Sequence, residues 1–137
     1  MKLRLAAVTQ LLADAQLPVA DLTDAHLQHF LVHGKEEAPD AIVGLELYPP
    51  VALLRSLAVS ADSRRQGVGS ALLADAEHYA RRHHAQEIYL LTTTAEEFFA
   101  RRGYEKMKRT DAPRAIQETQ EFSTLCAVTS TLMRKRL

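Results

Sequence analysis

The sequence has few of the features that assign a protein to a class at first sight. Cys126 is the only cysteine, so the chain can form neither an intrachain disulfide nor a thiolate cluster for a soft metal. The net charge is zero, with 17 Lys and Arg against 17 Asp and Glu, which argues against nucleic acid or an anionic membrane as a partner. Its apolar runs are far shorter than the ~20 residues of a membrane span. These absences favour a cytoplasmic protein.

The length and the order of elements predict one layered domain. With 137 residues and no repeat, low-complexity tract or linker, the chain is expected to form a single domain over 1–137. Short apolar runs predict strands, and apolar residues spaced three and four apart predict helices. A turn is expected over 34–39. Strands are expected over 1–8, 29–33, 40–48, 51–60, 86–92, 104–108 and 125–135, and helices over 9–16, 68–82, 92–104 and 111–122.

Local patterns predict part of the topology. The Tyr-Pro-Pro stretch at 48–50 separates two apolar runs, which predicts a hairpin, since proline is excluded from the middle of a sheet. The following helix and the run 86–92 complete a strand–helix–strand unit with parallel pairing. Thr93 or Thr94 is expected to cap the next helix, and Gly103 to end it. The fold class is therefore α/β or α+β, a mixed sheet with helices packed on it.

Gly67 and Gly69 stand between an expected strand and an expected helix, directly after two arginines. Glycine allows a tight turn and the close approach of a ligand, and helix N-termini attract anions. Arg64 or Arg65 can add charge-assisted hydrogen bonds to a phosphate. A P-loop is disfavoured because no Gly-Lys-Ser or Gly-Lys-Thr opens the helix, and a dinucleotide loop because Leu72 stands where a third small residue is required. The pattern predicts a phosphate site, the alternative being a helix-capping turn whose glycines bind nothing.

The stretch SADSRRQGVGSALL (60–73) resembles the acetyl-CoA loop of the GNAT superfamily of acetyltransferases, in which Arg or Gln, two residues, Gly, one residue, and Gly or Ala follow one another. LRSLAVSADS and FFARRGY resemble flanking segments of that family. The resemblance implies a mixed, mostly antiparallel sheet, splayed at the central strands, with flanking helices, and acetyl-CoA as cosubstrate without a metal. It also implies that a strand end pairs with pantetheine while the loop holds the pyrophosphate. The coenzyme-binding residues are then Leu57, Ala58, Val59, Arg64, Arg65, Gln66, Gly67, Val68, Gly69, Ser70 and Phe99.

Acetyl transfer to an amine requires a neutral nucleophile, a polarised carbonyl and a proton for the departing thiolate. A backbone N–H near Leu57–Val59 suffices to polarise the carbonyl. Glu46, in the strand GLELY, is the candidate general base, acting through water as the family often does. The alternative reading is a solvent-facing residue of an alternating strand. Tyr48 is a second candidate in this strand and is expected in the substrate site, the alternative being a residue that only packs.

The proton donor for the thiolate is the weakest part of the resemblance. Phe99 stands where the family commonly has a tyrosine, and Thr92 stands where it often has an asparagine. The thiolate then takes its proton from water or from the ammonium partner, or is assisted by Thr92 or Tyr104. This departure keeps open a catalytically weak CoA-binding or sensor domain.

Two narrower resemblances concern the acceptor. LLTTTAEEFFARRGYEKMKRTDAPRAI resembles amino-acid N-acetyltransferases of the N-acetylglutamate synthase type. LLRSLAV, LLTTTAEEFF and EFSTLC together resemble short GNAT proteins associated with arsenic resistance. Both imply a small, amino-acid-like amine, with a protein N-terminus or lysine as the alternative. Many relatives dimerise through strands near the C-terminus, which implies a homodimer.

An amino-acid acceptor carries an α-carboxylate, which an arginine can bind through two parallel hydrogen bonds. Arg55, beside the expected thioester strand, is the candidate partner; the alternative is an exposed arginine paired with a surface acid. Arg114 and Arg109 are weaker candidates. Cys126 is expected to be a small buried hydrophobe rather than a nucleophile, and the histidines lack a convincing set of metal ligands.

Overall fold

The computed structural model describes residues 5–14, 20, 26, 28–35, 38–60, 67–125 and 130–137. The chain divides into two compact units: the first unit comprises Met1–Glu46 and Leu54–Tyr79, and the second comprises Leu47–Leu53 and Ala80–Leu137. In chain order the elements are α1 (Leu5–Asp14), β1 (Phe30–Lys35), β2 (Ala38–Tyr48), β3 (Val51–Val59), α3 (Val68–Arg82), β4 (Glu87–Thr92), α4 (Glu96–Ala100), β5 (Glu105–Met107), the 3-10 helix η2 (Arg109–Asp111), α5 (Arg114–Gln117), the π-helix η3 (Glu121–Leu125) and β6 (Thr131–Arg136).

The strands form a six-stranded mixed sheet in the order β1-β2-β3-β4-β6-β5. β1 pairs with β2 in antiparallel fashion, and β6 does so with both β4 and β5. The turn between β2 and β3 contains only Pro49 and Pro50, and a connection this short joins antiparallel strands. β3 pairs with β4 in parallel, over Val51–Leu53 and Glu87–Tyr89, and runs on to Val59 beyond that ladder. The predicted hairpin, the parallel pair and the mostly antiparallel sheet are confirmed.

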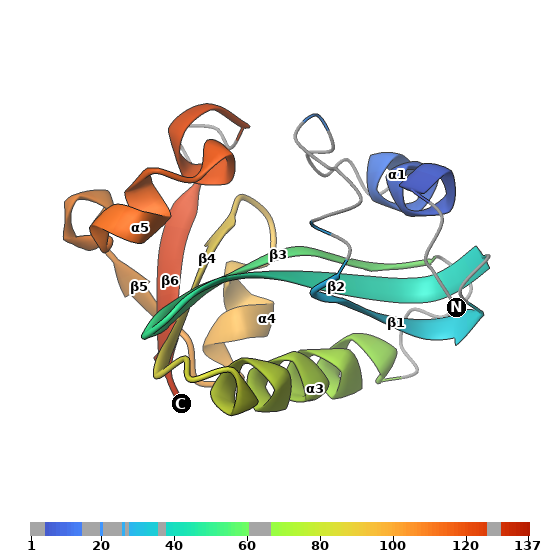
Figure 1. The fold of residues 1–137 in the computed structure, drawn as a ribbon, viewed down its shortest axis with the longest axis horizontal. Helices are drawn as coiled ribbons and strands as arrows, with labels where there is room; N and C mark the ends of the chain where they lie inside the picture. Colours follow the sequence, from blue (N-terminus) through green and yellow to red (C-terminus); the bar gives the residue numbers. More distant parts are fainter. Residues whose placement is uncertain are drawn as a thin grey trace. The chain divides into compact units, whose positions relative to one another are not determined.

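In the first unit, α1 and α3 lie on opposite faces of the strands (Figure 1). The α1 face is closed by fully buried Val8 and Leu12, which pack with Phe30, Ile42 and Ala58. Across the β1–β2 ladder, Phe30 is paired with a glycine at position 44, where any Cβ would overlap the phenyl ring. The ring therefore occupies the space that a side chain at position 44 would need.

The beginning of the chain differs from the sequence prediction. A strand was expected over 1–8 and a helix from Thr9, but α1 already begins at Leu5, so the strand is wrong for residues 5–8. Residues 1–4 lie outside the described part of the chain. The physical reason is that Val8, Leu11 and Leu12 recur at spacings of three and one, which puts them on one helical face against the core. Short apolar runs satisfy both patterns until a neighbouring surface decides between them.

The helix α3 has the bounds that the sequence predicted. Leu72, Ala76 and Ala80 recur every four residues and are buried, as an amphipathic helix on a sheet requires. Arg81 and Arg82 are exposed in its last turn, where cations interact favourably with the helix dipole. Its other end carries the glycines of the predicted phosphate loop.

In the second unit, η2, α5 and η3 cover one face of the strands, as Figure 1 shows for α5 beside β5 and β6. Ala112 and Ile116 pack there against Tyr89 and Leu132. The last strand is shorter than predicted, because β6 begins at Thr131 whereas a strand was expected over 125–135. Leu125 ends the π-helix instead, and residues 126–129, with Cys126, lie outside the described residues. The turn expected over 34–39 is also shorter, since β1 runs to residue 35 and β2 starts at residue 38.

Helix α4 is shorter than predicted and begins differently. Neither Thr93 nor Thr94 caps it within the described segment 92–104; the N-cap position is Ala95, with no side-chain hydrogen bond. Thr92 takes over part of that role, because its Oγ1 accepts a hydrogen bond from the Ala95 amide at 3.0 Å. Gly103 has φ of 94° after the helix, the left-handed conformation that was predicted for it.

Candidate functional site

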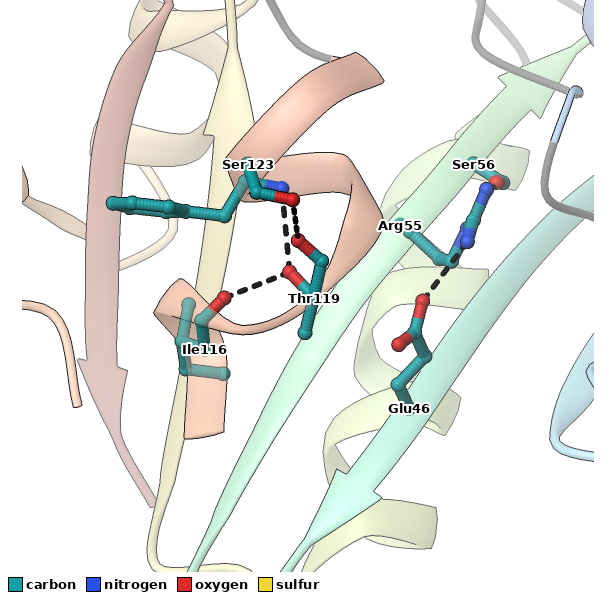
Figure 2. Close-up of polar contacts among 7 residues, drawn as sticks. Glu46, Arg55, Ser56, Ile116, Thr119 and Ser123 are labelled. Carbon is teal, nitrogen blue, oxygen red and sulfur yellow. Dashed lines mark hydrogen bonds and ion pairs between the residues drawn. The ribbon is translucent and has the colours of Figure 1, made fainter. Parts of the chain in front are cut away.

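Glu46 and Arg55, on the neighbouring strands β2 and β3, form an ion pair inside the first unit. Arg55 Nη1 donates to Glu46 Oε2 at 2.9 Å (Figure 2). The Arg55 side chain is fully buried, and that of Glu46 is 10% exposed. The fold thus brings together the predicted general base and the predicted partner of a substrate carboxylate. The surface arginine that was the alternative reading of Arg55 is wrong for this structure.

Ser56, directly after Arg55, is a polar residue of the same cluster that the sequence analysis missed. It is buried, with φ of 61°, and its Oγ accepts a hydrogen bond from Arg55 Nε at 3.1 Å (Figure 2). The only signal in the sequence is a small polar residue beside an arginine in an otherwise apolar strand. That signal does not reveal a left-handed backbone.

A buried ion pair of this kind adds little to stability by itself. Removing two charges from water costs several kcal/mol per ion, and the attraction between them roughly offsets that cost. Apolar residues of similar volume often give an equally stable fold. What the pair does provide is a carboxylate and a guanidinium side by side, held by neighbouring strands.

The described part of the predicted phosphate loop consists of a left-handed glycine and the start of α3. Gly67 has φ of 75°, and a Cβ added there would meet no atom of the described residues within 4 Å. Val68 and Gly69 follow in the first turn of α3, where amides point along the helix axis without acceptors in the helix. A phosphate suits such a position because of both the amides and the helix dipole. Arg64, Arg65 and Gln66 lie outside the described residues.

The end of β3 was predicted to pair with the pantetheine arm. Ala58 is buried in the α1 face of the core, while Leu57 and Val59 are half-buried. Ser60, just beyond the strand, donates its amide to the Asp40 carbonyl at 2.7 Å. The strand end is therefore well held, and its role toward a coenzyme stays a prediction.

The second unit holds the candidates for protonating the thiolate. Phe99 is buried, with ring centroids 5.1 Å from Phe98 and 5.5 Å from Tyr104, both in edge-on geometry. Tyr104 is also buried, and Lys135 Nζ lies 5.7 Å from its ring centroid. Phe99 is thus a core residue of this unit, and Thr92 is occupied with the turn that leads into α4.

The remaining predicted substrate residues also belong to the second unit. Tyr48 is half-buried at the edge of the cluster around Tyr89. Arg114 is exposed, and its Nε lies 3.7 Å from Glu118 Oε1. Arg109 donates to Ser130 Oγ at 2.9 Å and to a backbone carbonyl at 3.1 Å, so its guanidinium ties η2 to neighbouring segments. The joint site of these residues with Glu46 and Arg55 stays a prediction.

Two further observations concern only the described residues. No three His, Cys, Asp or Glu side chains among them are grouped closely enough to hold a metal ion. In that same part of the chain, no helix combines the length and the apolar character needed to cross a membrane.

Comparison with solved structures gives the same fold in several bacterial proteins. N-acetylglutamate synthase from Neisseria gonorrhoeae, solved with coenzyme A and N-acetyl-glutamate, aligns with a TM-score of 0.79 at 20% identity, over 97% of this chain and 32% of the synthase. The chain therefore spans about a third of the synthase's length. Rv2747 from Mycobacterium tuberculosis, solved with CoA and a second ligand, aligns with a TM-score of 0.76 at 20% identity, over 100% of this chain and 98% of that one. A GNAT acetyltransferase from Staphylococcus aureus gives 0.73 at 16% identity, over 97% and 92%.

The sequence itself gives the family assignment. No curated protein sequence matches the chain significantly. The family model described as "Acetyltransferase (GNAT) family" matches residues 6–108, more than half of the 137 residues. With the six-stranded mixed sheet and the glycine turn at the start of α3, this match establishes that the chain belongs to the GNAT family of acetyltransferases.

Proposed function

We propose that this protein transfers the acetyl group of acetyl-CoA directly to the α-amine of a small amino-acid-like molecule. Family membership supports the acetyl donor and an amine as acceptor. The observation that carries the narrower proposal is the buried pair of Glu46 and Arg55. An amino acid is a zwitterion, and a carboxylate beside a guanidinium is its electrostatic complement.

In the proposed complex, the Glu46–Arg55 ion pair separates, and the substrate becomes the new partner of both side chains. Its α-carboxylate binds the Arg55 guanidinium, and its α-ammonium lies toward the Glu46 carboxylate. Such an exchange offsets the cost of separating the two side chains, because each buried charge receives a new partner of opposite sign. An acceptor that lacks the carboxylate leaves Arg55 without that compensation and is disfavoured.

The chemistry then follows the requirements of acetyl transfer. Glu46, directly or through one water, takes a proton from the ammonium, and the neutral amine attacks the thioester carbonyl carbon. The new C–N bond forms, the nitrogen loses its second proton, and the C–S bond breaks. The CoA thiolate takes a proton, for which Tyr104, Thr92 and water remain the proposed sources. The products are the N-acetyl compound, free CoA and one proton.

The coenzyme is proposed to bind where the family resemblance places it. The amides at the start of α3, together with Arg64, Arg65 and Gln66, would hold the pyrophosphate, and Leu57–Val59 would pair with pantetheine. The left-handed backbone of Gly67 supports this assignment, since a side chain there would be strained. Among the described residues, no atom lies within 4 Å of a Cβ added at this position, which is compatible with a ligand there.

One of the structural relatives is relevant to the choice of acceptor. The gonococcal enzyme is an N-acetylglutamate synthase and was solved with N-acetyl-glutamate. This supports glutamate and its analogues as the first acceptors to test, although the identity is 20%. The link to arsenic resistance rests on the sequence resemblance alone, so organoarsenical amino acids belong in the same screen. The cytoplasmic location and the homodimer likewise stay predictions.

The test is an acceptor screen that pairs each amino acid with its α-carboxamide. CoA release and acetylated product are measured together, by a thiol reagent and by mass spectrometry. We expect kcat/KM to be about 10- to 100-fold higher for the free acid, since a hydrogen bond to a charged group contributes about 1.5–3 kcal/mol. Equal values for acid and carboxamide would count against Arg55 as the anchor. Acetylation of peptide termini or lysines alone would overturn the small-molecule acceptor, and CoA binding without turnover would favour the sensor domain.

Glu46→Gln tests the general base with the same assay. Loss of a positioned base lowers kcat by about 10²- to 10⁴-fold. Glu97→Gln is the matched control, because Glu97 also pairs with an arginine, at 2.8 Å, but its side chain is 81% exposed. A kcat of Glu46→Gln within twofold of the wild type would show that Glu46 is not the base.

A further inference from the structure

Ser56 occupies a backbone conformation that its residue type does not favour. Its φ of 61° lies in the left-handed region, within the strand β3. Glycine adopts this conformation without a steric penalty, and Asn or Asp tolerate it better than other residues. A serine there, buried and unable to relieve the strain, indicates that the hydroxyl contributes something glycine would lack.

The left-handed turn explains an unusual contact between sequence neighbours. In a regular strand, successive side chains point to opposite faces of the sheet, so residues 55 and 56 should not meet. Here Arg55 Nε donates to Ser56 Oγ at 3.1 Å, as Figure 2 shows. The conformation at Ser56 therefore brings its hydroxyl to the same side as the guanidinium.

This contact restricts the orientation of the guanidinium. A guanidinium is planar, and its N–H groups have fixed directions relative to one another. When Nε is held by Ser56, rotation about the last side-chain bonds is limited and Nη1 is directed to Glu46 Oε2, at 2.9 Å. Ser56 Oγ and Glu46 Oε2 therefore both restrict the plane of the buried Arg55 guanidinium.

We infer that Ser56 is a positioning residue, whose hydroxyl sets the orientation of the Arg55 guanidinium and thereby its presentation to a substrate carboxylate. The effect on turnover rests on the proposed function, while the effect on Arg55 itself does not. Ser56 acts through Arg55 and has no direct contact with reacting atoms in this scheme. Ser56 thus joins the proposed site through its left-handed backbone, which places the hydroxyl, and through the hydroxyl, which accepts from Arg55.

Ser56→Ala and Ser56→Gly test this inference in complementary ways. Both remove the acceptor, but the glycine variant also relieves the backbone strain, so it is expected to fold even where the alanine variant is weakened. The first readout is the Arg55 Nε–H signal in ¹⁵N NMR, which needs no activity. We expect its chemical shift to move and its exchange with water to accelerate at least about tenfold, because the N–H loses its hydrogen-bond acceptor.

The second readout is the preference for an amino acid over its α-carboxamide. In both variants we expect the ratio of the two kcat/KM values to fall about fivefold to tenfold, mainly through KM of the free acid, as loss of one hydrogen bond predicts. Ser56→Asn is the rescue variant, since Asn tolerates the left-handed region and offers an oxygen acceptor. It should recover part of the Arg55 signal and of the preference.

His84 offers the matched control. It is the other non-glycine residue with positive φ among the described residues, at 71°, and lies exposed after α3. His84→Gly relieves comparable strain without touching the ion pair, so the Arg55 signal and the preference should not change. An unaltered Arg55 signal in both Ser56→Ala and Ser56→Gly would overturn the inference. An altered signal in a protein that acetylates no amino acid would leave the positioning role intact and contradict the proposed function instead.

Discussion

The two units of this molecule use charged side chains in opposite ways. In the first unit, the pair of Glu46 with Arg55 is buried between neighbouring strands. In the second, Arg134 pairs with Glu105 and lies 3.5 Å from Glu87, while Arg136 lies 3.6 Å from the same Glu87. These side chains range from 16% exposed for Arg134 to 75% for Arg136, so water reaches the outer members of the network.

The ion-pair network of the second unit also shifts the pKa values of its members. The hydrogen bond from Arg134 is the main cause that lowers the pKa of Glu105, and the same bond raises the pKa of Arg134. Burial raises the pKa of Tyr89, helped by the nearby negative charge of Glu87, to which its hydroxyl donates at 3.2 Å. Because the charges are shared and hydrated, the loss of one member leaves the others with partners or with water.

Burial, rather than the distance between the charges, therefore decides how strongly an ion pair responds to the loss of one partner. The Arg55 side chain is fully buried and that of Glu46 is 10% exposed, so water compensates poorly for a lost partner in this pair. Such a pair is poor at adding stability but well suited to hold a charge ready for a ligand. Predictions for Arg55 and Glu105 compare the two kinds of ion pair, and a prediction for Tyr104 tests the proposed proton donor of the second unit.

The largest effect is expected from Arg55→Met. This change leaves the Glu46 carboxylate buried without its guanidinium, which costs about 3–5 kcal/mol of unfolding free energy. Arg101→Met is the matched control: Arg101 pairs with Glu97 at 2.8 Å, but both side chains are more than 70% exposed, so the loss should stay below about 1 kcal/mol. Urea unfolding at neutral pH measures both.

A second variant makes this prediction sharper. If the cost comes from an unpaired charge, Glu46→Met combined with Arg55→Met should recover much of the stability, while acetyl transfer stays abolished. Equal losses for Arg55→Met and Arg101→Met would show that the two pairs are energetically alike and would refute the comparison.

An intermediate effect is expected from Tyr104→Phe in the second unit. The variant keeps the edge-on contact with Phe99 and removes only the hydroxyl. If Tyr104 protonates the thiolate, kcat falls about 10²-fold with KM nearly constant. Tyr89→Phe removes another buried tyrosine hydroxyl and should leave kcat unchanged. Similar kcat values for both variants and the wild type would exclude Tyr104 and leave Thr92, water and the ammonium as sources of the proton.

The smallest effect is expected from Glu105→Gln. Because the folded-state pKa of Glu105 is lowered, its contribution to stability is present above the ordinary pKa of a glutamate and is lost as pH falls through the lower folded value. Thermal unfolding of the variant should therefore lie slightly below wild type at neutral pH, with the difference vanishing in acid and in high salt. A difference that grows on acidification would contradict the sign of this pKa shift.

The sequence predicted correctly those elements whose residue pattern is compatible with only one type of secondary structure. α3 was predicted with its bounds because Leu72, Ala76 and Ala80 repeat every four residues along the helix. The hairpin at Pro49 and Pro50 and the parallel pairing of β3 with β4 followed from proline chemistry and from the intervening helix. Predictions failed at short segments, such as residues 5–8, where an apolar run is compatible with strand and helix alike.

The amino-acid sequence alone was enough to assign the family and to name the chemical groups of the proposed site: a glycine turn at a helix start, a carboxylate in one strand and an arginine in the next. Only the tertiary structure decided that Glu46 and Arg55 bind one another and that Ser56 turns left-handed beside them. The physical reason is that both facts depend on how β2 and β3 align and on which side chains the core then excludes from water. Neither alignment nor burial is a property of any short stretch of chain.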